Sequence, residues 1–155
     1  MSKDRGPRIF FPPPIIYVLG FTASLALDHY LPLGISIQST LTEIIGSVVI
    51  MLGLLLIALG MGIFAKRKTG IVPIRPASEL VIQGIYHYTR NPMYLGMLLL
   101  YLGGVLVLDS AWAVPLLIPM LLIIRYYVIA REERYLSQLF GAAYVQYCQT
   151  VRRWV

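Results

Sequence analysis

The residues best suited to chemistry lie in one polar segment, Arg90-Asn91-Pro92-Met93-Tyr94, of a chain that is otherwise strongly apolar. Asn91 and Pro92 are typical of a helix start, with asparagine as the N-cap and proline at the first helical position. A helix that starts here directs free backbone amides and the positive end of its dipole toward the preceding arginine. Arg90 and this helix start together predict a binding site for a carboxylate or a phosphate.

Three tyrosines, Tyr86, Tyr88 and Tyr94, lie within or close to this segment. Tyrosines near a membrane interface often serve only as anchors, and that interpretation stays open. The alternative is that some of the rings face a bound cation, which a ring face stabilises by about 0.5–2 kcal/mol. A ligand that carries both an anionic and a cationic group would use Arg90 and the rings together.

Two acidic residues, Glu132 and Glu133, follow the last apolar stretch of the chain. One interpretation is a solvated helix face on which they pair with Arg131 or Arg134. Helical periodicity, however, places Glu132 on the same face as Leu136 and turns Glu133 away. Since a carboxylate on a packed face needs a partner, Glu132 is a candidate binding residue.

Arg125 lies seven residues before Glu132, which places the two side chains on nearly the same helical face, about 10 Å apart along the axis. They could bracket one ligand, and Arg125 is the candidate residue on the substrate side. The alternative is an arginine that extends to headgroup phosphates from the end of a membrane span.

Composition indicates that lipid surrounds the elements that carry these residues. Of the 155 residues, 58% are hydrophobic and 13% are charged, unlike the average soluble protein. Four stretches approach the length needed to cross a hydrocarbon core of about 30 Å, at residues 14–31, 44–65, 92–108 and 111–130. We therefore expect an all-α, polytopic membrane helix bundle that forms a single domain over residues 1–155.

Glycines recur every seven residues in the second and third stretches, at Gly46, Gly53, Gly60, Gly96 and Gly103. Seven residues make about two helical turns, so the glycines of each stretch share one face. Small residues allow helices in lipid to approach closely. We interpret these glycines as a packing surface between the two spans.

Two polar regions should build the site, namely residues 66–96 and 131–155. The connection between the second and third spans is longer than two neighbouring helices require. After residue 130, apolar residues recur at intervals of three and four up to Val151, which indicates a cytoplasmic amphipathic helix that continues the fourth span. We expect it to fold back over the bundle or to lie along the headgroups.

The basic residues indicate the orientation of the bundle. They fall in the N-terminal segment, in the central loop and after residue 130, with Arg125 near the end of a span, whereas the opposite loops carry Asp28, His29 and Asp109 without Lys or Arg. Both termini and the central loop are therefore expected in the cytoplasm. The net charge of +6 then reflects topology, and we predict no nucleic-acid partner. One cysteine and two histidines predict no metal site.

The sequence resembles a superfamily of integral membrane methyltransferases that includes isoprenylcysteine carboxyl methyltransferase and phosphatidylethanolamine N-methyltransferase. The strand and glycine-rich turn that mark soluble methyltransferases are absent from the sequence. The resemblance extends over residues 66–154, a little over half of the chain, and rests on Gly84-Ile85-Tyr86, the segment from Arg90 to Gly96, Glu132-Glu133, and Phe140-Gly141 with Tyr144 and Tyr147.

The resemblance implies S-adenosyl-L-methionine as the cofactor and a lipophilic acceptor that enters from the bilayer. It implies Arg90 and Glu132 as the principal residues of the site, with the rings and Glu132 suited to the cofactor's cations and Arg90 to its carboxylate. Transfer would be an in-line displacement, in which the site mainly aligns the reactants and excludes water. The implied cofactor contacts are Ser78, Glu79, Leu80, Val81, Gly84, Tyr86, Arg90, Asn91, Pro92, Met93, Tyr94 and Glu132.

Two positions depart from the better-known members of the superfamily. Asn91 stands where they have histidine, which removes a titratable base but keeps a side chain that donates and accepts hydrogen bonds. Their substrate-side arginine falls at Val128 of this chain, and Arg125, about one turn earlier, is the possible substitute.

The leading hypothesis is methyl transfer from S-adenosyl-L-methionine to a membrane-embedded acceptor, which could be an isoprenylcysteine carboxylate, a lipophilic thiol or a phospholipid amine. A second hypothesis is a reductase that uses NADPH, because membrane sterol reductases resemble this superfamily in their C-terminal half. A third is a non-enzymatic scaffold or transporter subunit that uses the glycine-lined helices as a packing surface.

Overall fold

The computed structural model describes residues 6–7, 9–71 and 77–154. Over these ranges every regular element is helical, as predicted. Residues 72–76, part of the segment expected to build the site, lie outside the described residues. Four basic residues on which the predicted orientation partly depends also lie outside them, namely Lys3, Arg5, Arg8 and Arg75.

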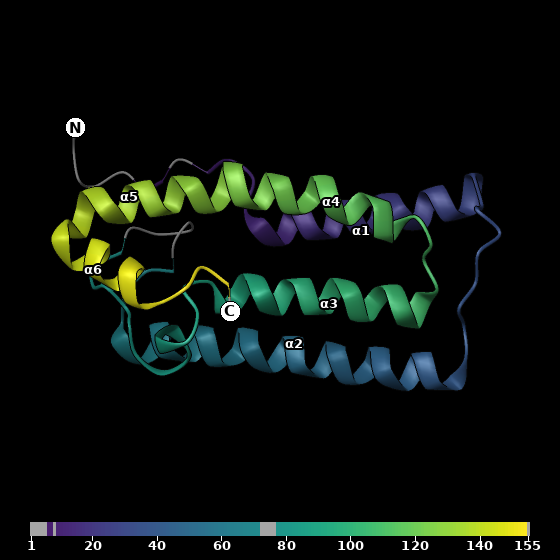
Figure 1. The fold of residues 1–155 in the computed structure, drawn as a ribbon, viewed down its shortest axis with the longest axis horizontal. Helices are drawn as coiled ribbons and strands as arrows, with labels where there is room; N and C mark the ends of the chain where they lie inside the picture. The colour runs from purple at the N-terminus through teal and green to yellow at the C-terminus, as the bar shows by residue number, and fades with distance from the viewer. Residues whose placement is uncertain (1–5, 8, 72–76, 155) are drawn as a thin grey trace.

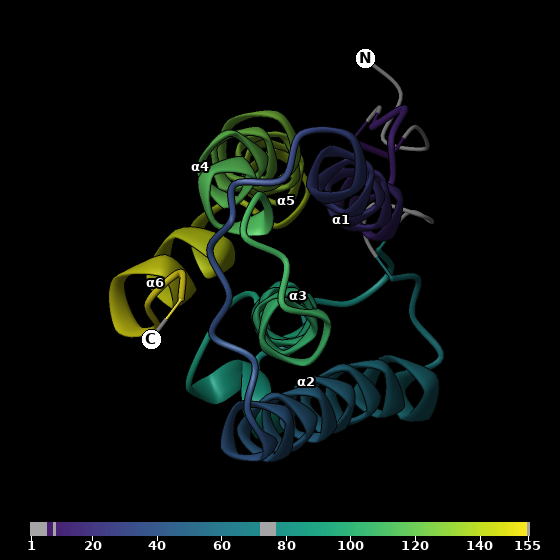
Figure 2. The ribbon, with the colours of Figure 1, turned by 90° about the vertical axis from the view of Figure 1, so that its right-hand side faces the viewer.

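The helices of the described residues pack in two layers. A 3-10 turn, η1, precedes α3, and a π-helix, η2, joins α4 to α5 without a break. Figure 1 shows α1, α4 and α5 in one layer and α2 with α3 in the other, and the end view in Figure 2 places α3 between α2 and the first layer. The elements are α1 (Pro13–Tyr30), α2 (Thr40–Arg67), η1 (Gly84–His87), α3 (Pro92–Leu108), α4 (Ala113–Ile123), η2 (Ile124–Ile129), α5 (Ala130–Phe140) and α6 (Ala142–Thr150).

The antiparallel pair α2 and α3 packs through the predicted glycines. A Cβ atom placed on Gly53 would lie 2.7 Å from the carbonyl oxygen of Gly96, and one on Gly103 would lie 2.7 Å from that of Gly46. Only glycine allows two backbones to come this close. The predicted packing surface is confirmed, and its register brings Met93, in the first turn of α3, against Gly60 near the end of α2.

Within the described ranges, two helices are long and apolar enough by themselves to cross a membrane, namely α2 and the continuous helix Ala113–Phe140. Of the other two predicted spans, α3 is apolar but has 17 residues, and α1 has prolines at its start and Asp28-His29-Tyr30 at its end. Only 11% of the most apolar stretch of α2 is buried inside the protein. Such an exposed apolar surface requires lipid or another partner.

The C-terminal amphipathic region is two helices, and the expectation of one continuous helix is wrong. Gly141 has a φ of 55°, a conformation that favours glycine and that ends helices. The chain turns there, and α6 folds back beside α5 (Figure 1). The turn buries Tyr144 and Tyr147, so α6 packs its tyrosines against the rest of the protein.

Candidate functional site

A pocket lies at the end of the bundle where α2 ends and α3 begins, and its walls come from α2, the segment 77–94, α5 and α6. Ser78 and Gly84 belong to the predicted set but do not line it. The predicted residues that the fold does bring together there are Glu79, Leu80, Val81, Tyr86, Arg90, Asn91, Pro92, Met93, Tyr94 and Glu132.

Six lining residues were not among the predicted contacts, and two of them, Tyr144 and Tyr147, reach the pocket because of the turn at Gly141. A glycine after an apolar residue at the end of a helical pattern signals a helix end. Had Phe140-Gly141 been interpreted in this way, α6 would have been expected to return toward the pocket. The missed residues are Phe64, Ala77, Glu133, Leu136, Tyr144 and Tyr147.

Glu132 is a buried carboxylate that pairs with no cation in the part of the chain that the structure describes. Its side chain is 7% exposed and accepts a hydrogen bond from the hydroxyl of Tyr94. Among the described residues, no basic nitrogen lies within 4.0 Å of it. The nearby cations contact Glu133 instead, with Arg90 at 3.2 Å and Arg153 at 2.7 Å. Because an unpaired buried charge is costly, the pocket is complementary to a positively charged ligand.

Arg90 is held in place by several contacts, but one of its side-chain donors, the Nε, has no partner among the described residues. Its guanidinium pairs with Glu133 and contacts the sulfur of Cys148, while its backbone amide donates to the carbonyl of Arg152 over 3.0 Å. Its Nε is buried and has no hydrogen-bond partner among the described residues. A buried donor of this kind requires an acceptor, which an anionic ligand group would supply.

Asn91 occupies the N-cap position of α3, as predicted, but its side chain does not cap the helix. Instead its Nδ2 donates to the carbonyl of Arg153 over 2.9 Å. The C-terminal segment therefore holds the start of α3 from outside, through Asn91 and through the amide of Arg90. Pro92 follows at the first helical position, also as predicted.

Aromatic rings form much of the remaining wall. Tyr86 is 5% exposed, its ring meets Phe64 edge to face at 5.4 Å, and its carbonyl accepts from the hydroxyl of Tyr147 over 2.6 Å. Burial raises the pKa of Tyr86 and of Tyr147, so both are neutral at physiological pH. The hydroxyl of Tyr86 has no partner among the described residues. Tyr88, by contrast, is 77% exposed and lies outside the pocket.

The fold does not bring Arg125 to the pocket. In the π-helix that contains it, each residue advances less around the axis than in an α-helix. Val128 is fully buried, whereas Arg125 is exposed, with its guanidinium 5.4 Å from the ring centre of Tyr126. The shared face expected for Arg125 and Glu132 assumed regular α-helical spacing, and the π-helix removes it.

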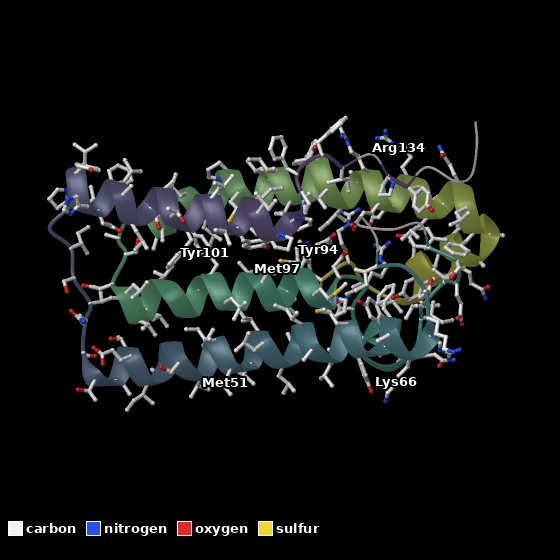
Figure 3. The ribbon with its side chains drawn as sticks, turned by 180° about the vertical axis from the view of Figure 1, so that it is seen from behind. Met51, Lys66, Tyr94, Met97, Tyr101 and Arg134 are labelled. Atoms are coloured by element: carbon white, nitrogen blue, oxygen red, sulfur yellow. The ribbon has the colours of Figure 1, made fainter. Side chains whose placement is uncertain are left out.

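An apolar groove of about 570 Å³ lies beside the pocket, between α1, α2 and α3, and none of the described residues that line it is charged. Figure 3 shows Tyr94, Met97 and Tyr101 following one another along the face of α3 that lines it. Met93 and Tyr94 line both the groove and the pocket. The first turn of α3 is therefore the wall that the two cavities share.

Comparisons with known proteins agree with the resemblance seen in the sequence. A family model described as phospholipid methyltransferase matches residues 41–143, more than half of the chain. An uncharacterized protein of Haemophilus influenzae is 44% identical over 63 residues, which are 41% of this chain and the whole of that protein. No solved structure matched the chain. The matched family region includes the glycine packing surface, the start of α3 and Glu132, and on this evidence the chain belongs to the phospholipid methyltransferase family.

Proposed function

We propose that this chain transfers a methyl group from S-adenosyl-L-methionine to a lipophilic acceptor held in the bilayer. Membership of the family supports methyl transfer to a membrane lipid. The observation that carries the cofactor assignment is Glu132, a buried carboxylate in an aromatic pocket that pairs with no cation among the described residues. When bound, the cofactor supplies a methyl group attached to a positively charged sulfur, together with an ammonium and a carboxylate.

The pocket residues form two sets, one suited to the positive groups of the cofactor and the other to its carboxylate. Glu132 and the buried faces of Tyr86 and Tyr144 stabilise positive groups. The unpartnered Nε of Arg90 and the start of α3 stabilise a carboxylate. Two of the buried groups without partners in the described structure, the hydroxyl of Tyr86 and the Nε of Arg90, are thus donors on the wall of a site that requires acceptors.

The pocket has to widen to accept a ligand of nucleoside size, because its free space is about 80 Å³. The segment 77–83 forms its outer wall and contains no regular helix or strand. We expect this segment to move outward on binding while α3 and α5 keep their places, because helix packing holds them.

The acceptor's apolar chain occupies the groove between α1, α2 and α3, and its reacting group lies at Met93 and Tyr94. Uncharged walls suit a hydrocarbon chain, and the shared turn of α3 brings that chain next to the cofactor pocket. The residues of this turn then act by alignment and by excluding water.

Four membrane spans within one domain, residues 1–155, are part of the proposal. The glycine surface ties α3 to α2 along much of its length, and α1 packs on both α3 and α4. Apart from Arg125, which lies in η2, the described Lys and Arg residues lie in the last turn of α2 and in the segments after it that build the pocket end, where Figure 3 labels Lys66 and Arg134. By the positive-inside rule the pocket then faces the cytoplasm.

Calorimetry in detergent tests the cofactor assignment. The protein should bind S-adenosyl-L-methionine and not NADPH, and Glu132→Gln should lower the affinity by about 100-fold or more, because removing one partner of a buried charge pair costs about 2–5 kcal/mol. Glutamine still accepts the hydrogen bond of Tyr94. The control is Glu43→Gln, an exposed residue at the opposite end that accepts from Gln38, which should bind normally.

Each other outcome of that experiment has a clear meaning. Binding of NADPH in place of S-adenosyl-L-methionine would identify a reductase. Binding of neither compound would favour a scaffold or a transporter subunit. An unchanged affinity in Glu132→Gln would show that Glu132 does not face the cofactor.

A further inference from the structure

Tyr94 lies between the two cavities, and its hydroxyl group can exchange protons with groups in both of them. Its side chain is 6% exposed and lines both the apolar groove and the pocket. Its hydroxyl donates a hydrogen bond to Glu132 across the space between α3 and α5. Its backbone carbonyl accepts from the hydroxyl of Tyr17 over 3.4 Å, which ties this turn of α3 to α1. A hydroxyl placed in this way can pass a proton from one cavity to the other.

The charge of Glu132 has to be balanced after transfer as well as before it. Before transfer the positive sulfur lies in the same pocket as the carboxylate. Loss of the methyl group removes that charge and leaves a buried carboxylate with one cation fewer. Arg90 and Arg153 cannot replace it without leaving Glu133, which they already contact. A proton delivered to Glu132 would restore the balance.

The acceptor can supply that proton only if its nucleophile carries one. A lipid thiol or a neutral amine meets this condition, while a carboxylate does not. A carboxylate would also bring a second negative charge next to Glu132, into a groove whose described lining residues are all uncharged. Arg125, the candidate residue on the substrate side, is exposed and lies 5.4 Å from the ring centre of Tyr126 instead.

We infer that Tyr94 relays a proton from the acceptor to Glu132 during methyl transfer, and that the acceptor is a lipid thiol or amine. This inference rests on the proposed function. The acceptor's heteroatom forms a bond to the methyl carbon as the carbon–sulfur bond breaks and its electron pair stays on sulfur. The acceptor's proton passes to the oxygen of Tyr94, whose own proton moves to the carboxylate of Glu132.

The substitution Tyr94→Phe tests the relay, with labelled cofactor and vesicles of total lipid extract as the acceptor. We expect kcat to fall by about 100-fold or more, the usual range for general acid–base catalysis, with little change in KM or in the calorimetric affinity for S-adenosyl-L-methionine. The control is Tyr135→Phe, which removes another buried hydroxyl from α5, one without a partner among the described residues. It should leave kcat unchanged. An unaltered kcat in Tyr94→Phe, or a loss explained by weaker cofactor binding, would overturn the relay.

Two measurements on the unsubstituted protein test the inference independently of whether that variant folds. Calorimetry in buffers of different ionisation heat should show that S-adenosylhomocysteine, which lacks the positive sulfur, takes up more protons on binding than S-adenosyl-L-methionine does. Equal proton uptake would mean that Glu132 does not accept the proton. Mild alkali should also release no labelled methanol from the lipid product, because methyl groups on sulfur or nitrogen stay attached, whereas labelled methanol from a methyl ester would identify a carboxylate acceptor and overturn the inference.

Failure of the inference and failure of the proposed function give different results. A protein that does not bind S-adenosyl-L-methionine disproves the proposed function itself. A protein that binds it and methylates lipid, but shows a normal kcat in Tyr94→Phe, retains the function and loses the relay.

Discussion

Both ends of the helix bundle place polar side chains among apolar helices. In the described structure, these side chains find hydrogen-bond partners within the protein at one end, while at the other end several of them do not. At the end away from the pocket, Asp28 accepts hydrogen bonds from the hydroxyl of Ser110 and from the amide of Trp112, the latter over 3.2 Å. The hydroxyl of Ser110 also lies 3.1 Å from that of Ser24. These bonds tie α1 to the connection between α3 and α4.

At the pocket end, comparable groups lack partners among the described residues. Glu132 has a hydrogen bond but no cation, and the hydroxyl of Tyr86 and the Nε of Arg90 have no hydrogen bond at all. Satisfied polar groups stabilise a fold, while unsatisfied buried groups destabilise it unless something binds them. The comparison therefore separates the part of the molecule that holds the helices together from the part adapted to a ligand.

The largest expected difference between the two ends is in stability. Asp28→Ala should lower the free energy of unfolding in detergent by about 1–3 kcal/mol, because it removes the acceptor shared by Ser110 and Trp112 and leaves the amide of Trp112 unpaired. Cofactor affinity should be unchanged. Glu132→Gln should show the opposite pattern, with weakened cofactor binding and stability that is equal or higher, because it removes a buried carboxyl that has no cation among the described residues.

Denaturant titrations and calorimetry on the same samples would make this comparison. Glu43→Ala, an exposed substitution at the same end as Asp28, serves as the stability control and should stay within about 0.5 kcal/mol of the parent. If Glu132→Gln destabilised the protein as much as Asp28→Ala does, the distinction between the two ends would fail.

A smaller effect is expected where the C-terminal segment holds the pocket. Arg153 donates to Glu133 through two nitrogens, at 2.9 and 2.7 Å, a geometry that lysine cannot reproduce. Arg153→Lys should therefore lower the free energy of unfolding by up to about 1 kcal/mol, the scale of a partly exposed ion pair. The measurement is a denaturant titration at low and high salt, in which high salt should reduce the difference. Arg134→Lys, at an exposed position, should show no such change.

The smallest effect is expected at Asp109, in the connection opposite the pocket. Hydrogen bonds from the hydroxyl of Ser36 and the amide of Ile37 lower the pKa of this carboxyl below its ordinary value of 3.8. A lowered pKa in the folded state contributes stability above the unfolded pKa, and this stability is lost as the pH falls through the folded pKa.

Thermal unfolding of the parent and of Asp109→Asn can detect that contribution. The difference in melting temperature between the two proteins should be constant near neutral pH and shrink as the pH falls below about 4. A difference that stays the same down to the lowest pH tested would contradict the lowered pKa.

Helices and their packing could be predicted because they follow from local rules. Apolar stretches of sufficient length predict helices in lipid, and α3 has the bounds expected from its apolar run. The seven-residue spacing of glycines predicted the close pairing of α2 with α3, which the fold confirms at Gly53 and Gly96. The membrane spans could be predicted less well, because α1 and α3 are short and depend on their neighbours.

The components of the site were visible in the sequence, but their arrangement was not. The start of α3, the buried carboxylate of Glu132 and the wall residue Tyr86 could be selected by type and spacing. Two local departures from regular α-helix determine which of the other side chains reach the pocket. The π-helix turned Arg125 away from the pocket, and the positive φ of Gly141 brought Tyr144 and Tyr147 into it.

The sequence by itself determined an all-helical chain, a close helix pair and a polar segment suited to an ion. Each of these depends on residues near one another in the chain or on a regular repeat. Only the tertiary structure decided that Arg90 pairs with Glu133 rather than Glu132, and that Tyr94 stands between two cavities. The reason is physical, because the partner of a buried charge is chosen by distances between helices that a regular repeat does not specify.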